Sequence, residues 1–373
     1  MNVKTAKAIV YVAPEKVELR EFDLPEVPDD DETIIEIEAA GIDGSEVKMY
    51  LGEFEFFNNN PPITMGDELV GRVCAIGTKA AERRNLKVGD RVTVETSFPC
   101  GECDACHAGQ YYLCDKGMPN RSLGWTPTSV RPLMGAYATH VRAHKDMLIY
   151  KIPEDMPTDV AIMCVSVFAN SLRWAGERSQ VGPGSKVLII GPGPQGIMAG
   201  LASKILGADK VVMVGTRNSE DRLKMSLRMG CDTTFYFDED DLESKIIEAL
   251  GGRPDTVIES SGVTKCEEFA IQIVKKMGRV NFIGVGFDPL PVDVSLLMSK
   301  EIMVFSSLAH PFPYIDKAIE TGYKIWKDGK YPIEEMVTHK FSLEEADLAL
   351  RTAAKKVPGQ RPVKTVLYPK AAQ

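Results

Sequence analysis

Four cysteines crowd into a fifteen-residue stretch of the chain: Cys100, Cys103, Cys106 and Cys114. Thiolates at these spacings let one loop fold around a tetrahedral Zn²⁺, with Zn–S distances of about 2.3 Å. Because four thiolates fill the coordination shell, no position stays open for water or substrate. We therefore expect a structural zinc that stabilises the loop.

Three further features limit which class of protein this can be: the remaining cysteines, the net charge and the N-terminal pattern. The other four cysteines are scattered, and the first residues alternate apolar and charged side chains instead of forming the apolar core of a signal peptide. This usage favours metal over disulfides. A net charge of −9 without basic clusters argues against nucleic-acid binding, and no run of about 18 apolar residues predicts a membrane span. We expect a cytoplasmic protein that acts on small molecules.

A glycine-rich turn, GPGPQG, lies between the apolar run KVLII and the helical run IMAGLASKILG. Its first glycine permits a tight turn, its second lets the backbone approach a pyrophosphate, and its third allows the helix to pack on the strand. The N-terminus of that helix faces the phosphates. The turn predicts a dinucleotide site with contacts from Gly191, Gly193, Pro194, Gln195 and Gly196.

The next apolar strand ends at Gly215, Thr216 and Arg217, where an NAD-binding site usually presents an acidic residue. A carboxylate would repel a ribose 2′-phosphate, whereas a guanidinium binds it with two hydrogen bonds. These three residues therefore favour NADP. Glu220 and Asp221 follow closely and leave NAD open, because a carboxylate there can serve a ribose hydroxyl.

Two kinds of pattern divide the chain. Short alternating or apolar runs broken by Gly and Pro predict a β-rich first part, and apolar strands alternating with helical stretches then predict a doubly wound parallel sheet of the Rossmann type. An amphipathic helix and a last strand, KTVLYP, follow. We expect an α/β fold whose parts are a dinucleotide domain at 158–299, a β-rich domain at 1–157 and 300–373, and a zinc lobe at about 96–117.

In this order, the pieces resemble the medium-chain dehydrogenase/reductase superfamily of zinc-type alcohol, sorbitol and threonine dehydrogenases. The resemblance covers essentially the whole chain and implies a GroES-like catalytic domain. Family members usually carry G-I-C-G-[ST]-[DE] and G-H-E stretches, whose Cys and His bind a catalytic zinc. GIDGSE and MGDE look like these stretches, with Asp43 and Asp67 in place of Cys and His. Glu68 keeps the carboxylate of the second stretch, and Cys164 falls where a third ligand usually lies.

These departures leave two interpretations of the catalytic site open. Asp43, Asp67, Glu68 and Cys164 can form a second metal site, because Zn²⁺ accepts carboxylates and harder oxygen ligands favour Mn²⁺ or Mg²⁺ relative to the original set. Alternatively the site is free of metal, Cys164 is a buried helix residue, and the carboxylates accept hydrogen bonds from substrate hydroxyls.

A site without a Lewis acid needs another group to take the proton of the alcohol. Lys48 lies five residues after Asp43, where family members often place the His of a proton relay, and Ser45 matches the relay hydroxyl. The resemblance thus implies proton transfer through Ser45 and Lys48. Equally, Lys48 can be a surface lysine paired with Glu46 or Asp67.

Together these features predict an oxidoreductase that transfers a hydride between NADP(H), or NAD(H), and a secondary alcohol or ketone. Because several carboxylates accept hydrogens from several hydroxyls, a sugar, polyol or cyclic alcohol is the expected substrate. One alternative is a zinc-free reductase of activated carbon–carbon double bonds, which the cysteine lobe disfavours. Another is a non-catalytic nucleotide-binding protein. The resemblance also implies a homodimer or homotetramer.

Overall fold

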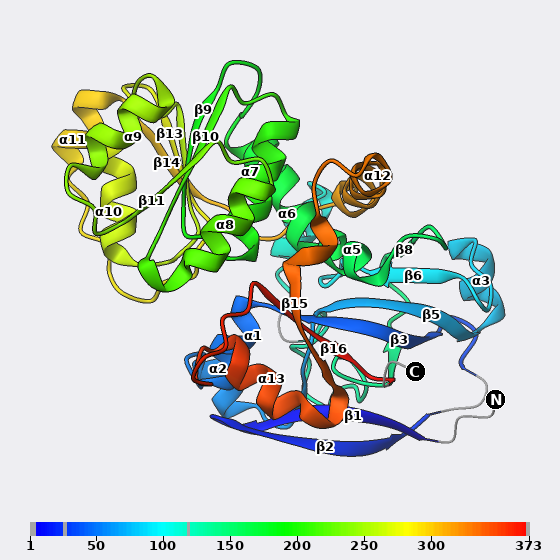
Figure 1. Ribbon diagram of the computed structural model, residues 1–373. Helices are drawn as coiled ribbons and strands as arrows, with labels where there is room; N and C mark the ends of the chain where they lie inside the picture. The colour runs from blue at the N-terminus through cyan, green and yellow to red at the C-terminus, as the bar shows by residue number, and fades with distance from the viewer. Residues whose placement is uncertain (1–4, 25–27, 118–119, 371–373) are drawn as a thin grey trace. The chain divides into compact units, whose positions relative to one another are not determined.

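The computed structural model describes residues 5–24, 28–117 and 120–370 of the chain (Figure 1). The chain divides into two units. The first comprises Met1–Ser166, Pro311–Tyr323 and Val337–Gln373, and the second comprises Val167–His310 and Lys324–Met336. The second unit starts later than residue 158 because helix α5 (Thr158–Met163) packs against strands β3 (Thr33–Ile42) and β5 (Glu68–Ile76) of the first unit. No helix in the described ranges is both long enough and apolar enough to cross a membrane.

The first unit is built on two sheets. A seven-stranded sheet has the order β15-β16-β3-β5-β6-β8, with β7 paired to β3, and a three-stranded sheet has the order β2-β1-β4. Most neighbours are antiparallel, but β15 and β16 run parallel. The strands are β1 (Thr5–Ala13), β2 (Lys16–Asp23), β3 (Thr33–Ile42), β4 (Ile63–Thr64), β5 (Glu68–Ile76), β6 (Arg91–Val94), β7 (His140–Ala143), β8 (Ile149–Lys151), β15 (Val337–Ser342) and β16 (Lys364–Tyr368).

Alternation of side chains along these strands gives the first unit its core. Apolar side chains from both sheets, among them Tyr11, Ile35 and Val73, form one buried cluster together with residues of the intervening loops. The helices of this unit are short and lie in the connections: α1 (Gly44–Tyr50), α2 (Glu55–Asn59), α3 (Thr78–Arg84), α4 (Asp104–His107) and α13 (Ala346–Ala353). Helix α12 (Tyr314–Asp328) starts in the first unit and ends in the second.

The second unit is a six-stranded parallel sheet in the order β11-β10-β9-β12-β13-β14. Its chain alternates strand and helix, as the apolar runs predict. Leu188 and Val212 meet Ile246 and Ile273 of α9 and α10 in one buried cluster, while α7 contacts β9, β10 and β12. The elements are β9 (Lys186–Ile190), β10 (Lys210–Gly215), β11 (Thr233–Tyr236), β12 (Thr256–Glu259), β13 (Arg279–Phe282), β14 (Met303–Ser306), α6 (Ala169–Leu172), α7 (Pro194–Ile205), α8 (Glu220–Arg228), α9 (Leu242–Leu250), α10 (Thr264–Ile273) and α11 (Val294–Lys300).

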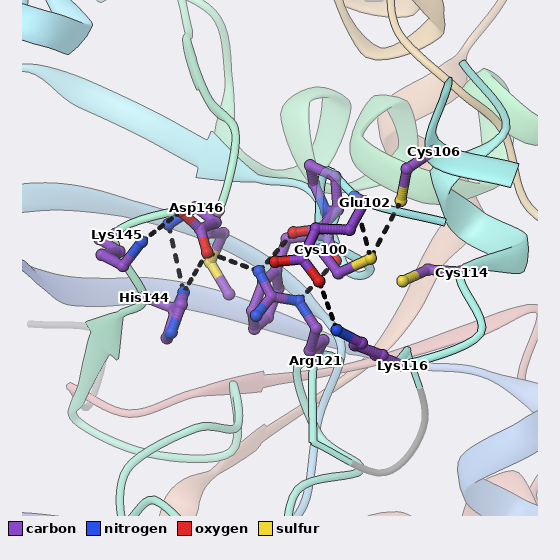
Figure 2. Close-up of polar contacts among 12 residues, drawn as sticks. Cys100, Glu102, Cys106, Cys114, Lys116, Arg121, His144, Lys145 and Asp146 are labelled. Carbon is purple, nitrogen blue, oxygen red and sulfur yellow. Dashed lines mark hydrogen bonds and ion pairs between the residues drawn. The ribbon is translucent and has the colours of Figure 1, made fainter. Parts of the chain in front are cut away.

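The four clustered cysteines form a lobe of the first unit. Their Sγ atoms all lie within 4.8 Å of one another, with 3.9 Å between Cys100 and Cys106 and 4.0 Å between Cys103 and Cys114. Figure 2 shows the sulfur atoms of Cys100, Cys106 and Cys114 turned toward a common centre. Sulfur atoms at the corners of a tetrahedral zinc site are about 3.8 Å apart, so the lobe has the geometry of a four-thiolate zinc site.

We expect the purified protein to keep about one zinc ion per chain after extensive dialysis, because four thiolates close the coordination shell. Cys103→Ala should lose this zinc and make the lobe sensitive to proteolysis, since metal binding offsets the entropy of ordering the loop. Elemental analysis and limited proteolysis measure both effects.

Cys266→Ala is the matched control, because Cys266 lies in α10, outside the lobe. It should leave the zinc content unchanged. Full zinc content in Cys103→Ala would reject Cys103 as a ligand.

Candidate active site

Asp43 is fixed by the start of helix α1, which it caps. Its Oδ1 accepts hydrogen bonds from the Glu46 backbone N–H at 2.9 Å and from the Ser45 hydroxyl at 2.8 Å. The Glu46 carboxylate accepts the Asp43 backbone N–H at 3.0 Å, which completes a capping box. The local sequence D-G-S-E thus orients the Asp43 carboxylate.

Glu46 also connects α1 to Asp67, which directly precedes β5. Its Oε1 accepts the Asp67 backbone N–H at 2.9 Å, and the Tyr137 hydroxyl donates a hydrogen bond to its Oε2. Glu46 is buried, and this burial, with the charges of Asp67 and Asp43, raises its pKa well above the ordinary value. One carboxyl group therefore holds the backbone at both altered motif positions.

Glu68, the first residue of β5, forms a buried ion pair with Lys364, the first residue of β16. Lys364 Nζ lies 2.6 Å from Glu68 Oε2, and the two side chains are 1% and 0% exposed. Both strands pair with β3, which brings these residues together although they are distant in sequence. A Cβ at Gly41 of β3 would stand 2.0 Å from Glu68 Oε2 and 3.0 Å from Lys364 Cε, so the pair requires glycine there.

Asp43, Asp67 and Glu68 bring carboxylate oxygens within 4.8 Å of one another. Within the described residues, Asp67 Oδ1 and Glu68 Oε1 are buried without a hydrogen-bond partner. Burial and the charges of Asp43 and Glu68 raise the pKa of Asp67 well above its ordinary value. Burial also raises the pKa of Glu68, against the opposing effect of Lys364. Such unused acceptors call for a ligand that donates hydrogens or carries positive charge.

We call Asp43, Glu46, Asp67 and Glu68 the acidic cluster. The Lys364 ammonium is in contact with this cluster. Burial by itself lowers the pKa of Lys364, but the charges of Glu68, Asp43 and Glu46 outweigh burial, so that its pKa is raised. The ammonium therefore stays charged inside the protein, where it balances part of the negative charge.

Lys48 lies on α1, one turn after Ser45. Its Nζ forms an ion pair with Glu53 at 2.8 Å, and the side chains are 27% and 38% exposed. This partner differs from Glu46 and Asp67, which the sequence suggested for a surface lysine. Residues three apart share one face of a helix, so Ser45 and Lys48 lie on the same side of α1. The relay itself stays a prediction.

An aromatic group flanks Asp67. The Trp125 side chain hydrogen-bonds to Asp67, which opposes the rise in the Asp67 pKa. Its ring lies 4.7 Å from the ring of Phe57 and 5.8 Å from that of Phe54, between ring centroids. Trp125 is only partly buried. The acidic cluster therefore has an apolar surface beside its polar atoms.

The glycine-rich turn of the second unit joins β9 to α7 as the sequence predicts. Gly191 has φ = +99°, a left-handed conformation that favours glycine. A Cβ at Gly196 would lie 2.0 Å from the carbonyl oxygen of Gly191, so the close approach of helix and strand also requires glycine. At Gly193, the N-cap of α7, nothing lies within 4 Å of an added Cβ. This opening leaves room for a phosphate at the N-terminus of the helix.

The end of β10 presents Arg217 to solvent. Its Nε lies 2.9 Å from Asp238 Oδ2, its guanidinium carbon lies 4.8 Å from the centre of the Tyr236 ring, and its side chain is 63% exposed. Thr216 directly before it closes a capping box with Ser219. Arg217 is thus anchored at the strand end while most of its side chain remains open to a ligand.

The chain matches known proteins along nearly its whole length. Residues 29–154 match the alcohol dehydrogenase GroES-like domain, and residues 194–321 match the zinc-binding dehydrogenase family. A sorbitol dehydrogenase of Bombyx mori is 30% identical over 94% of this chain and 97% of its own, and an erythritol/L-threitol dehydrogenase of Mycolicibacterium smegmatis is 31% identical over 97% of both chains. The chain belongs to the zinc-type medium-chain alcohol dehydrogenase superfamily. A solved alcohol dehydrogenase from Thermotoga maritima shares the fold, with a TM-score of 0.85, 25% identity and coverage of 98% and 100%.

Membership makes this chain a nicotinamide-dependent alcohol dehydrogenase, and it confirms the expected Rossmann and GroES-like domains. An alcohol dehydrogenase of this superfamily is expected to hold a catalytic metal. The oxygen-only donor set, with its unused Asp67 Oδ1 and Glu68 Oε1, fits a hard cation such as Mn²⁺ or Mg²⁺ better than zinc. A cation held by Asp43, Asp67 and Glu68 would supply a Lewis acid that polarises the alcohol oxygen.

Cys164 is not part of this carboxylate group as the described residues place it. Its fully buried Sγ lies beside Gly322 of α12, where an added Cβ would meet it at 2.3 Å. Burial raises the pKa of the Cys164 thiol, which disfavours the thiolate that binds metals. The surroundings of Cys164 are those of a packed helix residue.

Sequence reasoning did not find three residues of this alcohol dehydrogenase that hold the acidic cluster together: Glu46, Tyr137 and Lys364. Glu46 lies within the GIDGSE stretch, where its spacing from Asp43 is that of a capping box and was a usable signal. Tyr137 lies in an irregular loop and gave none. Lys364 opens a strand whose first four residues are buried, and a lysine that is buried there must have a partner.

Tyr137→Phe removes a buried hydroxyl that donates to Glu46. We expect it to lower the free energy of unfolding by about 1–3 kcal/mol, because the Glu46 carboxyl group loses a buried hydrogen bond. Urea unfolding followed by tryptophan fluorescence measures the loss.

Tyr323→Phe is the matched control, because the Tyr323 hydroxyl makes its hydrogen bond to Asp155 at an exposed site, at 2.9 Å. It should cost less than about 0.5 kcal/mol. Equal costs for the two variants would contradict the bridging role of Glu46.

Proposed function

We propose that this alcohol dehydrogenase interconverts a secondary alcohol and its ketone with NADP(H), and that its substrate is a polyol, sugar or cyclic alcohol. The acidic cluster carries this proposal. Asp67 Oδ1 and Glu68 Oε1 are buried acceptors without partners in the described chain, and neighbouring hydroxyl groups of a polyol can donate to both. The partly exposed face of Trp125 suits the carbon side of such a substrate.

Names of related proteins support the substrate class. Sorbitol, erythritol and L-threitol, named for the relatives from Bombyx mori and Mycolicibacterium smegmatis, are all polyols. Another relative, from Saccharomyces cerevisiae, is named a D-xylulose reductase and is 28% identical over 92% of this chain. Several adjacent hydroxyl groups are common to these compounds. A cluster with several carboxylates can accept hydrogen bonds from several hydroxyl groups of such a compound.

The residues divide the chemical work among them. Bound NADP supplies the acceptor for the hydride that leaves the alcohol carbon. Asp67 and Glu68 orient the hydroxyl groups, so that one carbon is presented for reaction. Oxidation of the alcohol needs a base, so Lys48 acts in its neutral amine form: the Ser45 hydroxyl passes its own proton to the Lys48 nitrogen as it takes the proton of the reacting hydroxyl. Asp43, whose Oδ1 accepts the Ser45 hydroxyl at 2.8 Å before substrate binds, positions Ser45.

NADP is preferred because an exposed guanidinium, rather than a carboxylate, follows β10. Arg217 is fixed laterally by Asp238 and by the Tyr236 ring, which leaves its remaining N–H groups for a 2′-phosphate. Glu220 already has Lys224 as an ion-pair partner, at 2.8 Å.

A panel of polyols, cyclic alcohols and simple secondary alcohols tests the function, with NADPH formation as the readout. We expect the highest kcat/KM for a polyol, because it alone fills several acceptors. Turnover of activated alkenes with none of the alcohols would overturn the proposal in favour of a double-bond reductase.

The same assay separates the relay from a surface ion pair. Lys48→Met should lower kcat by ~10²–10⁴-fold if Lys48 takes the proton. Glu53→Gln is its control, because it breaks the ion pair and keeps the ammonium. The relay is wrong if Lys48→Met keeps full activity while a chelator reversibly abolishes the activity of the unaltered enzyme. In that case a metal held by Asp43, Asp67 and Glu68 activates the alcohol.

We expect Arg217→Ala to weaken NADP binding by about 1.5–3 kcal/mol, because a charge-assisted pair to the 2′-phosphate is lost. NAD binding should stay nearly unchanged. Fluorescence titration with both reduced cofactors measures the two affinities.

Lys224→Ala is the matched control, since Lys224 is an exposed cation of α8 that pairs with Glu220. It should weaken both cofactors little and equally. A loss of the same size for NADP and NAD in Arg217→Ala would refute the assignment of Arg217.

A further inference from the structure

Lys364 is among the most buried large side chains of the first unit, at 1% exposure. Its Nζ contacts Glu68 Oε2 at 2.6 Å, yet the angles leave Nζ without a well-formed hydrogen bond to any described residue. Taking an ammonium group out of water costs several kcal/mol unless opposite charge compensates it. The acidic cluster provides that compensation.

Strand pairing forces the ammonium into the cluster. β16 and β5 both pair with β3, and the missing side chain of Gly41 leaves the gap through which the Lys364 stem reaches Glu68. A Cβ there would lie 3.0 Å from Lys364 Cε. The register of the two strands on β3 and the missing side chain at Gly41 thus bring Lys364 into contact with Glu68.

The acidic cluster has four carboxyl groups, and one ammonium balances only one of them. A divalent cation bound by Asp43, Asp67 and Glu68 would neutralise the same excess of negative charge. It would need Glu68 as a ligand, and the Lys364 ammonium already contacts Glu68 Oε2. Like charges a few ångströms apart in a buried site repel strongly. The ammonium and a metal ion therefore compete.

We infer that Lys364 is the resident counter-charge of the acidic cluster: it positions Glu68 and weakens the binding of a divalent cation by Asp43, Asp67 and Glu68. This inference rests on the proposed role of the cluster as the ligand site. It assigns to a residue of the last strand control over whether the site works with a metal or without one.

Manganese binding tests the inference without any turnover. Mn²⁺ is added to the zinc-loaded full-length chain, and the concentration of free Mn²⁺ is measured by electron paramagnetic resonance. The four-cysteine lobe does not interfere, because thiolates prefer zinc to manganese. We expect Lys364→Met to bind Mn²⁺ at least about tenfold more tightly than the unaltered chain, since one repulsive charge is gone. Lys364→Arg keeps the charge and should bind like the unaltered chain.

Two further variants locate the effect. Lys340→Met removes an exposed cation of β15 that pairs with Asp159, and it should leave Mn²⁺ affinity unchanged. Adding Asp43→Asn to Lys364→Met should abolish the gain, because a ligand is lost. Equal affinity in Lys364→Met and the unaltered chain, or no binding by either, overturns the inference.

Loss of the ammonium also strands buried carboxylates, so Lys364→Met can fold poorly. Thermal unfolding with and without Mn²⁺ covers this case. A larger rise in Tm with Mn²⁺ for Lys364→Met than for the unaltered chain supports the inference, and an equal or absent rise refutes it. Because these readouts need no substrate, they are independent of the alcohol assay, and either proposal can fail alone.

Discussion

The buried ion pair between Glu68 and Lys364 is the interaction on which the candidate site depends. It joins the first residues of two strands across a third, and it places a positive charge among four carboxyl groups. Without that charge, the buried carboxyl groups of Glu46 and Glu68 would have to hold protons or bind a cation. Three features support this arrangement. The capping box of α1 orients Asp43 and Glu46, while Gly41 and the register of the sheet leave space for the contact between Lys364 and Glu68.

Replacement of soft ligands by aspartates changes more than the metal preference. A thiolate and an imidazole would bind zinc with two donors that need few further partners, whereas carboxylates have additional lone pairs to satisfy. The chain supplies some of these partners: Ser45 and the α1 backbone for Asp43, and, from distant parts of the chain, Trp125 for Asp67 and Lys364 for Glu68. The altered motif thus has polar partners for part of its carboxylate oxygens, while Asp67 Oδ1 and Glu68 Oε1 stay available to a ligand.

How far the sequence could predict the molecule depended on the range of the interactions. The cysteine spacing and the glycine-rich turn are local, so the clustering of the four cysteines and the β9–α7 turn could be predicted, as could the α/β fold class. Residues 364 and 68 meet only because β16 and β5 share β3 as a neighbour, and no spacing in the chain announces that pairing. Tyr137 reaches Glu46 from an irregular loop for the same reason. Lys48, which the motif position favoured, is paired with Glu53, a contact set by side-chain conformation.

The order of these residues along the chain has a consequence for synthesis. Asp43, Asp67 and Glu68 leave the ribosome early, the whole second unit follows, and the lysine that neutralises them arrives afterwards. The first unit is therefore completed only when β16 joins its sheet, and β16 is synthesised after all strands of the second unit. Until then the Glu68 carboxylate has water as its partner, and its pairing with Lys364 waits for a strand that is synthesised after an inserted domain.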